Sequence, residues 1–476
     1  MYFVLWCNGS TADFGSVSQG SNPCGTTKLK IQLTKVLTVM NIKRKEEKVF
    51  FNTSIFSYAD FIEESALEQI ENVCKTIDVK NYYIMPDVHA GYFAPIGSVI
   101  CTEGIIVPEL LGNDIGCGIS CRYLGLNVND FNKEDLKKKL DSLFAFLTDP
   151  NKFPLNVRNI KRDDKSSNAI NDTVFKISDL FYDRLKSLNV PGVSKEKLDR
   201  ACGTVGGGNH FVEICTDDEG NLFSTVHTGS RFLGQVILDF VTQKIREDKN
   251  TFDEVASLFS FLNSEPAAIK EFSNEEISKI QYSIERLSIG YTWLEVFNLI
   301  NVAQEWAKAN RTFINSTIDY FLNPESEFSS KRVSDKFDFP TYIDCEHNRL
   351  NYIRNKNGQN TYIHRKGAAL LDNGFGIIAG SQTDGSYIVK GTENNTLNMC
   401  SHGAGRVLSR TQARESLDVE SERAKLNEAV PYNTFKDKKS LEECSSAYKN
   451  IDEVLLLQSD LVTPIAHLKP LMNIKA

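Results

Sequence analysis

The chain has 476 residues, of which 41% are hydrophobic and 24% are charged, and its formal net charge is −8. This composition is ordinary for a globular protein, and the negative charge disfavours non-specific binding to nucleic acid, although a local basic pocket could still bind it. No apolar run approaches the roughly 20 residues that cross a bilayer, so we expect no membrane anchor.

The first segments of the chain differ in character. Residues 1–39 are rich in Gly, Ser, Asn and Thr and lack apolar periodicity, which predicts a disordered leader, or a protein whose true start is Met40. Apolar residues at helical spacing predict a helix over 65–77. The run NYYIMPDVH (81–89) predicts a buried strand that ends at a loop, and residues 96–126 are β-rich with glycine turns.

The middle of the chain predicts helices, over 133–200 and again over about 245–340, and the charge runs of the first stretch are typical of solvated helix faces. The last third returns to short strands and glycine turns. Chemical motifs run from Asp87 to Lys475 with the helical stretches between them. We therefore predict an α+β fold in one large interleaved domain over 40–476, with a central β-rich active-site core and peripheral helical segments.

Eleven cysteines are scattered along the chain without a CxxC pair. Together with the lack of a secretory signal pattern, this predicts a reducing, cytoplasmic setting. Most of these cysteines are expected to be small buried hydrophobic residues. Cys117 is the exception, because it lies in the glycine-rich loop GNDIGCG.

Five of the seven histidines lie in short motifs with glycine or asparagine flanks: His89, His210, His227, His347 and His402. A histidine that packs in a core needs no glycine beside it. Glycine does allow the backbone to approach a metal or a phosphate closely, so this pattern predicts a metal- and phosphate-handling enzyme.

The candidate metal donors combine three chemical types. Asp114 and Cys117 can supply a carboxylate and a thiolate, and three histidines can supply imidazole: His210, His227 and His347. Five donors exceed what one tetrahedral ion needs, so the pattern predicts two adjacent ions that share Cys117. Ligand softness alone favours zinc.

Two glycine motifs, GTVGGGNHF (203–211) and SHGAGR (401–406), can place several backbone N–H groups around a phosphate, and GSQTDGS (380–386) adds hydroxyls. Neither motif is a P-loop, and a tight turn is the alternative reading. His402 is the candidate nucleophile, with Arg406 and Arg410 to neutralise phosphate charge, or else it is another metal ligand.

The chain carries the following motifs, in this order: MPDVHAGYFAPIGSV, GNDIGCG, GTVGGGNHFVEI, VHTGSRFLG, EHN, HRKGA, GSxxxxS, SHGAGRVLSR and AHLKPLMNIKA. On these motifs the chain resembles the RtcB family of RNA-splicing ligases over roughly residues 60–476. The resemblance implies GTP-dependent joining of a 2′,3′-cyclic-phosphate or 3′-phosphate RNA end to a 5′-hydroxyl end, in tRNA splicing or RNA repair. It also implies that the bound metal is manganese rather than zinc, as two ions. The RNA substrate and any activating protein partner stay open.

The resemblance also implies residue roles. His402 would carry a covalent guanylate, and Asp87 is the candidate to orient it. Metal would be bound by Asp114, Cys117, His210, His227 and His347. GTP or GMP would contact Asn209, His210, Phe211, Glu213, His347, Asn348, Gly380, Ser381, Gln382, Ser386, His402, Gly403, Ala404, Gly405 and Lys475, with Lys475 reading guanine. The candidates for RNA phosphate are Arg231, Lys366, Arg406 and Arg410.

The chain departs from the family pattern at four positions: Asn113, where an aromatic residue is common, Phe232, where glycine is usual, and Gln382 and Asp384, where Met and Gly are usual. These departures put substrate preference in question. Three alternatives are an enzyme that caps 3′-phosphate ends without joining them, a metal-dependent phosphodiesterase, and an inactive RNA-binding relative. The complete donor set argues against the last, and His402 argues against the phosphodiesterase.

Overall fold

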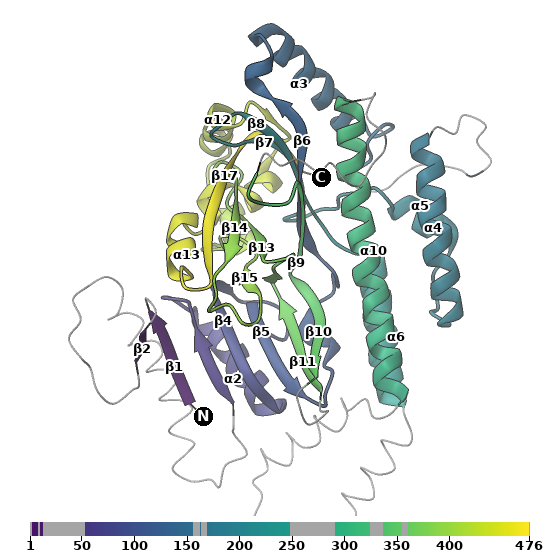
Figure 1. Cartoon of the computed structure of the whole chain (residues 1–476), viewed down its shortest axis with the longest axis vertical. Helices are drawn as coiled ribbons and strands as arrows, with labels where there is room; N and C mark the ends of the chain where they lie inside the picture. Colours follow the sequence, from purple (N-terminus) through teal and green to yellow (C-terminus); the bar gives the residue numbers. More distant parts are fainter. Residues whose placement is uncertain are drawn as a thin grey trace, which may run out of the picture.

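The structure is a computed structural model that describes residues 2–7, 10–12, 53–155, 162, 169–247, 291–323, 337–354 and 360–475. Two large sheets stand end to end, and long helices run along one side of them (Figure 1). The expected α+β class, with a β-rich centre and peripheral helices, is confirmed.

The first sheet has, among the described residues, the strand order β10 (Asn348–Arg354), β11 (Asn360–Lys366), β5 (Ile96–Glu103), β4 (Val79–His89), β3 (Ser54–Ser57), β1 (Tyr2–Cys7) and β2 (Ser10–Ala12). Helix α2 (Glu64–Thr76) links β3 to β4, which run parallel. The predicted helix over 65–77 and the predicted strand over 81–89 are thus confirmed.

The leader was expected to lack regular structure, yet its first residues form β1 and β2 at the edge of this sheet. The run YFVLWC in β1 is aromatic and β-branched, which suits a strand. Residues 13–39 of the leader lie outside the described residues.

The second sheet has the order β13 (Phe375–Ala379), β14 (Ser386–Gly391), β17 (Val462–Ile474), β7 (Phe211–Thr216), β8 (Asn221–Thr228), β6 (Gly118–Asn127) and β9 (Tyr342–Glu346), and β16 (Tyr432–Asn433) pairs with β17. A short pair, β12 (Ala368–Leu370) and β15 (Met399–Ser401), forms a separate ladder. The chain passes from the first sheet to the second between β5 and β6, and returns at His347, the one residue between β9 and β10. The domain is therefore interleaved, as predicted.

The helices at the side are α3 (Lys133–Thr148), α4 (Ala169–Ser187), α5 (Lys195–Ala201), α6 (Phe232–Glu247) and α10 (Tyr291–Leu322). Helix α10 contacts strands of both sheets, including β6, β8 and β10 (Figure 1). The helical prediction for 133–200 is confirmed where that stretch is described. Of the predicted helical segment 245–340, residues 248–290 and 324–336 lie outside the described residues.

Shorter helices border the C-terminal half: α11 (Arg410–Ser416), α12 (Val419–Ala429) and α13 (Ile451–Leu457), with the 3₁₀ turns η3 (Lys438–Glu443) and η4 (Ser445–Ala447). Two further 3₁₀ turns, η1 (Pro108–Leu111) and η2 (Val128–Asp130), flank β6.

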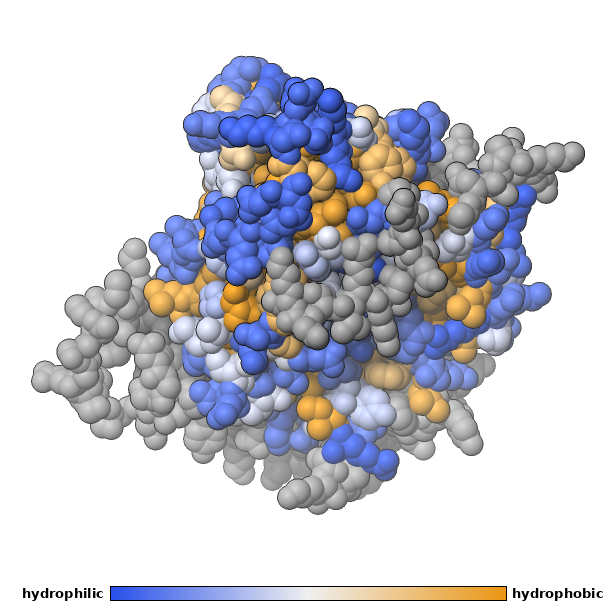
Figure 2. All heavy atoms as spheres, turned by 45° about the horizontal axis from the view of Figure 1, so that its top comes forward, coloured by the Kyte–Doolittle hydropathy of each residue, from blue (hydrophilic) through white to orange (hydrophobic). Residues whose placement is uncertain are grey.

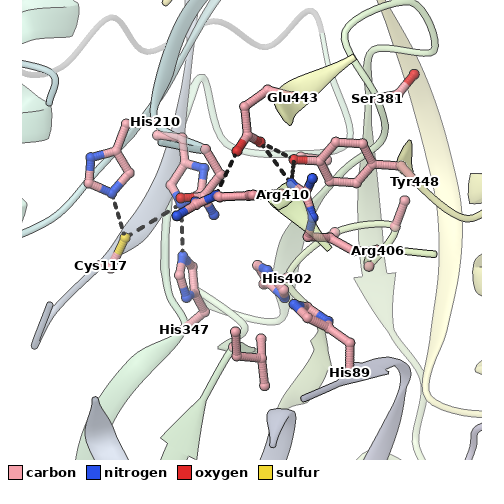
Figure 3. A pocket seen from close by; sticks show the side chains of 18 of the residues that line it. His89, Cys117, His210, His347, Ser381, His402, Arg406, Arg410, Glu443 and Tyr448 are labelled. Carbon is pink, nitrogen blue, oxygen red and sulfur yellow. Dashed lines mark hydrogen bonds and ion pairs between the residues drawn. The ribbon is translucent and has the colours of Figure 1, made fainter. Parts of the chain in front are cut away.

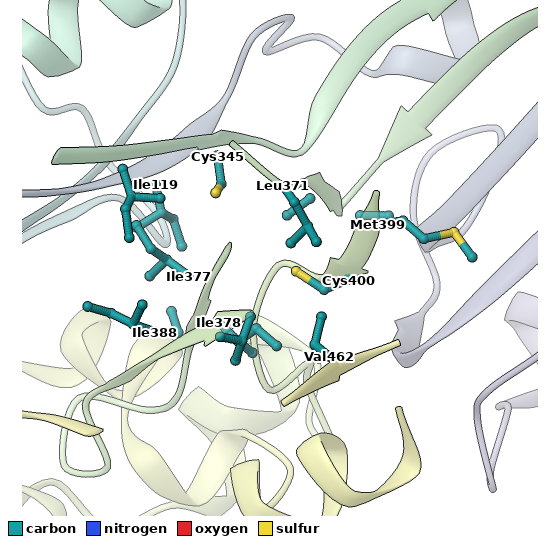
Figure 4. Close-up of a cluster of buried hydrophobic side chains, with 14 of the residues drawn as sticks. Ile119, Cys345, Leu371, Ile377, Ile378, Ile388, Met399, Cys400 and Val462 are labelled. Carbon is teal, nitrogen blue, oxygen red and sulfur yellow. The ribbon is translucent and has the colours of Figure 1, made fainter. Parts of the chain in front are cut away.

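One apolar cluster lies directly beneath the motifs (Figure 4). It includes Ile119 on β6, Cys345 on β9 and Cys400 on β15, which stand two positions from Cys117, His347 and His402 respectively. Burial of a side chain such as that of Ile119 contributes about 1.5–3 kcal/mol. The packing of this core therefore fixes the strand ends that carry the chemical groups.

The nine cysteines whose burial the structure describes are buried and form no disulfide with one another, and burial is what the sequence predicted for most cysteines. On the face drawn in Figure 2, hydrophilic residues cover the protruding top and hydrophobic residues show between them. Among the described helices, none combines the length and the hydrophobicity that a membrane crossing demands.

Candidate metal-dependent active site

A cavity of about 990 Å³ opens where the two sheets meet. This volume lies at the upper end of the range for small-molecule sites. Most of the sequence-predicted site residues line it: Asn209, His210, Phe211, Glu213, His227, Asp114, Cys117, His347, Asn348, Lys366, Gly380, Ser381, Gln382, His402, Gly403, Ala404, Gly405, Arg406, Arg410 and Lys475. Three predicted residues, Asp87, Arg231 and Ser386, are not among the described residues of its wall.

The five sequence-predicted metal donors all line the cavity. Figure 3 shows three of them, Cys117, His210 and His347, close together. Cys117 Sγ lies 3.3 Å from His210 Nε2 and 3.4 Å from His227 Nε2. His227 Nε2 lies 3.0 Å from His347 Nε2, and His210 Nε2 lies 3.2 Å from the Asp114 carboxylate. The donor atoms of Cys117, His210 and His227 all fall within 4.8 Å of one another.

The sheet register explains this convergence. Strand β8 lies between β6 and β7, and His227 on β8 stands opposite Ile119 and Phe211. Cys117 and His210 each precede their strands by one residue, so both flank His227 at the same end of the sheet. Strand β9 pairs with β6, and His347, which follows β9 by one residue, lies at that same end.

These donors fit a divalent cation. His210 Nδ1 donates a hydrogen bond to the Val205 carbonyl at 3.0 Å, which leaves Nε2 as a ligand atom. Burial, with smaller contributions from neighbouring positive groups, lowers the pKa of both His227 and His347 well below the ordinary value, so their rings are neutral and carry lone pairs. Burial and the Asp114 carboxylate raise the pKa of the Cys117 thiol, an effect that a bound dication would reverse.

His402 stands beside the donor cluster, with its ring centroid 4.9 Å from that of His347. Its Nδ1 donates to Asp87 Oδ2 at 2.6 Å, and the same oxygen accepts from the backbone N–H groups of His402 and Gly403. Asp87 is fully buried beneath the cavity wall. This contact holds the Nδ1–H tautomer and leaves the Nε2 lone pair of His402 available.

The buried Asp87 carboxyl is charged. Burial acts to raise its pKa, but the electrostatic attraction and the hydrogen bond between Asp87 and His402, with smaller contributions from His89 and Lys449, lower it below the ordinary value. Lys449, which the sequence did not single out, donates to the carbonyls of Pro86 and Val88 on either side of Asp87. His89 lines the cavity and donates from Nδ1 to the Asp87 carbonyl at 2.8 Å.

Three glycines of these motifs also make room for other site residues. A Cβ on Gly229 would overlap the Asp114 carboxylate, and a Cβ on Gly405 would overlap the Asp87 backbone. A Cβ on Gly208 would stand 2.9 Å from the Arg410 guanidinium. At these positions the close neighbour is another site residue, so the glycines make room for protein groups.

The far side of the cavity is basic and is organised by Glu443, which the sequence did not single out (Figure 3). Glu443 accepts hydrogen bonds from Arg406 at 3.3 Å, Arg410 at 3.1 Å and the Tyr448 hydroxyl. Burial acts to raise the pKa of Glu443, but Lys475, Arg406 and other neighbours lower it overall. Its position in a charged stretch without a motif gave no signal in the sequence.

Lys475 reaches this region from the end of the chain. Its Nζ lies 3.9 Å from Glu443 Oε2 and 5.7 Å from the centre of the Phe211 ring. Glu213 is buried nearby and accepts from Asn473 Nδ2 at 2.5 Å. Burial raises the pKa of Glu213 to about 7.

The remaining predicted residues fall into two groups. Lys366 lines the cavity and donates to the Tyr92 carbonyl, and Asn348 Nδ2 donates to the Asp114 carbonyl at 3.1 Å. Arg231 instead donates from Nε to Thr204 Oγ1, and Ser386 is buried away from the cavity wall.

The departures from the family pattern have local explanations. The Asp384 carboxylate accepts a hydrogen bond from Ser381 Oγ at 2.7 Å, and Gln382 donates to the Glu443 carbonyl at 2.5 Å. Phe232 is the first residue of α6 and packs against the apolar cluster on that side. Asn113 lines the cavity beside Asp114.

A cluster of thiol, imidazole and carboxylate groups, a histidine oriented by a buried carboxylate, and a basic wall opposite them share one cavity. Together they define a candidate metal-dependent transferase or ligase site, in which an oriented imidazole can act as the nucleophile.

Comparison with known proteins specifies this class further. The model of the RtcB family, described as tRNA-splicing ligase RtcB, matches residues 69–476. RNA-splicing ligase RtcB of Escherichia coli (strain K12) is 29% identical in an alignment of 429 positions that covers 87% of this chain and 95% of that protein. tRNA-splicing ligase RtcB of Thermococcus kodakarensis is 28% identical, over 86% of this chain and 90% of that protein. The chain therefore belongs to the RtcB family.

Proposed function

We propose that this protein is a GTP-dependent RNA ligase that joins a 2′,3′-cyclic-phosphate or 3′-phosphate RNA end to a 5′-hydroxyl end, in tRNA splicing or RNA repair. Membership of the RtcB family supports RNA ligation, because the relatives compared above are named RNA-splicing or tRNA-splicing ligases. The observation that carries the covalent route is the 2.6 Å contact between His402 Nδ1 and the buried Asp87 carboxylate, next to the donor cluster.

The proposed reaction begins with His402. Its Nε2 attacks the α-phosphorus of GTP, so a phosphorus–nitrogen bond forms and pyrophosphate leaves. The negative charge of Asp87 stabilises the positive charge that develops on the imidazole. An RNA 3′-phosphate oxygen then takes the GMP from His402, and the 5′-hydroxyl attacks the RNA phosphorus and expels GMP. A cyclic phosphate is first opened by hydrolysis.

The donors Asp114, Cys117, His210, His227 and His347 would hold the metal, which we propose is manganese, as two ions. When bound, these ions would orient the triphosphate and offset charge on phosphorus. Donor softness alone would favour zinc because of the thiolate, so the choice of manganese rests on the family resemblance.

The other proposed contacts follow the two walls of the cavity. Phe211, Glu213 and Lys475 would hold the guanine, with the Lys475 ammonium donating to the base O6. Lys366, Arg406 and Arg410 are cations on the cavity wall that suit RNA phosphate. Arg231 is a weaker candidate for that role, because it bonds to Thr204 outside the described wall.

The test is incubation with Mn²⁺ and GTP labelled at the α-phosphate. We expect an acid-labile covalent GMP adduct on the wild type and none on His402→Ala. An equal adduct on both proteins would contradict the assignment of His402, and no adduct on either would contradict the covalent route. RNA fragments with cyclic-phosphate and 5′-hydroxyl ends then separate joining from capping and from hydrolysis, since only a ligase yields the joined product.

A further inference from the structure

Arg311 is a fully buried arginine outside the cavity wall, at the middle of α10. Its Nε donates to Asp344 Oδ1 at 2.6 Å, and its terminal nitrogen Nη2 lies 3.6 Å from Glu346. The other terminal nitrogen donates to two backbone carbonyls, of Gly116 at 2.7 Å and of Thr228 at 2.9 Å.

Each of these partners is close in sequence to a proposed metal donor. Gly116 precedes Cys117, Thr228 follows His227, and Glu346 precedes His347. One guanidinium therefore touches three separate segments that meet at the donor cluster. Arg311 itself is not among the described residues that line the cavity, so it acts on the cluster only through these segments.

The surrounding backbone is shaped to admit this contact. A Cβ on Gly118 would stand 3.1 Å from the Arg311 Cζ and 2.5 Å from the Cys345 carbonyl. Gly116 has φ +78°, and a Cβ there would stand 2.7 Å from Gln304 Cα on the same helix. Two glycines of the loop GNDIGCG thus allow α10 and its arginine to approach the loop.

The same helix makes similar contacts at Asn310, which directly precedes Arg311, and at Gln304, two turns earlier. Asn310 accepts from the Gly203 N–H at 2.7 Å and donates to the Thr204 carbonyl, at the start of the segment that leads to His210. Gln304 accepts from the Leu350 N–H at 2.7 Å, on the strand that follows His347. Helix α10 therefore contacts every segment that carries a histidine of the cluster.

We propose that Arg311 is a positioning residue that holds Cys117, His227 and His347 at the mutual distances required to bind metal. A planar guanidinium has five fixed donors, so it can bond two carbonyls and a carboxylate at once, whereas a lysine ammonium cannot match that geometry. The inference rests on the proposed metal role of these residues. It adds that the geometry of the cluster is set from α10 rather than by the β-sheet alone.

Helix α10 also supplies a matched control. Asp319, two turns further along, forms a buried ion pair with Arg122 Nε at 3.1 Å, and neither residue borders a donor. If Arg311 only stabilised the fold, disruption of either buried pair would have the same consequence. If Arg311 positions the donors, only its replacement would alter metal binding.

The experiment compares the wild-type protein, Arg311→Lys, Asp319→Asn and Cys117→Ser. Binding of Mn²⁺ and of Co²⁺ is measured by titration, with the cobalt–thiolate absorption as a direct report on Cys117. Replacement of a residue that holds the ligands of a metal site in place weakens metal binding by about 10- to 100-fold. We expect a loss of that size for Arg311→Lys, a change of less than about threefold for Asp319→Asn, and loss of the thiolate absorption for Cys117→Ser.

Hydrogen exchange of the metal-free proteins provides a readout that needs neither metal nor activity. Exchange over residues 114–118, 226–229 and 346–348 should rise in Arg311→Lys and stay at the wild-type level in Asp319→Asn. Wild-type metal affinity and exchange in Arg311→Lys would overturn the proposal, as would equal losses in both variants. A wild type that binds metal but forms no GMP adduct would contradict the proposed ligation and leave the role of Arg311 supported.

Discussion

Replacement of Asp87 by Asn tests whether the carboxylate, rather than the shape of the pocket, activates His402. Asp87 Oδ2 accepts from His402 Nδ1 at 2.6 Å and from two backbone N–H groups at 3.1 and 3.3 Å. An amide of the same size keeps the volume but removes the charge. Its oxygen can still accept from the backbone, yet the Nδ1–H tautomer of His402 loses its preferred partner.

The size of the effect has two bounds. A hydrogen bond to a charged group contributes about 1.5–3 kcal/mol, which corresponds to roughly 10- to 150-fold in rate. Where a carboxylate fixes the tautomer of a catalytic histidine, its replacement by an amide lowers kcat by about 10⁴-fold. We therefore expect formation of the His402 adduct to slow by more than about 10-fold and by up to about 10⁴-fold in Asp87→Asn.

The assay is a single-turnover measurement of adduct formation at saturating Mn²⁺ and labelled GTP, with GTP affinity measured separately. Because Asp87 does not line the described cavity, GTP affinity should stay within about threefold of the wild type while the rate falls. Asp199→Asn is the control, since Asp199 is also buried and its carboxylate pairs with Arg162 Nε at a distance of 2.7 Å. Neither Asp199 nor Arg162 is among the described residues that line the cavity. A rate within tenfold of the wild type in Asp87→Asn, or an equal loss in Asp199→Asn, would refute the reasoning.

Two more outcomes concern the proposed guanine contacts. Lys475→Ala removes the ammonium beside Phe211, so we expect the preference for GTP over ATP to fall by about tenfold or more, measured by competition in the adduct assay; an unchanged ratio would remove Lys475 from base recognition. The Glu213 pKa is raised to about 7 by burial, so its carboxylate protonates as the pH falls through that value and can no longer accept from both guanine N–H donors. GTP affinity should therefore weaken towards acidic pH in the wild type and vary less in Glu213→Gln, and parallel pH profiles would contradict this role.

Local pattern was sufficient to predict several elements of the fold. The helical spacing of apolar residues predicted α2, and the apolar run before Asp87 predicted β4, because each depends on residues close in sequence. The strand order of the two sheets could not be predicted in this way. The pairing of β17 with β7, for example, joins residues more than 240 positions apart, and no local period records such a contact.

The residues of the candidate site likewise include some that the sequence could predict and others that it could not. The five donors and His402 have flanking sequences that mark them, and the structure brings all of them to one cavity. Glu443 and Arg311 have no such mark, since a charged residue in a helical or 3₁₀ stretch is typical of a solvated surface. Gln304, Arg311 and Asn315 lie at helical spacing on α10, yet this polar face is the buried one. Only the backbone groups that this face of α10 contacts in the folded structure distinguish it from a solvated surface.

The departures from the family pattern now have a physical interpretation. The Asp384 carboxylate accepts from Ser381 Oγ at 2.7 Å, and Asp384 itself is not among the described residues of the cavity wall. Gln382 does line the wall, and its donation to the Glu443 carbonyl joins the nucleotide side of the cavity to the carboxylate that holds Arg406 and Arg410. Of the four departures, Asn113 and Gln382 therefore lie on the wall where GTP and RNA would be held, whereas Phe232 and Asp384 are not among its described residues. The donor cluster and the Asp87–His402 pair keep the arrangement that the proposed chemistry needs.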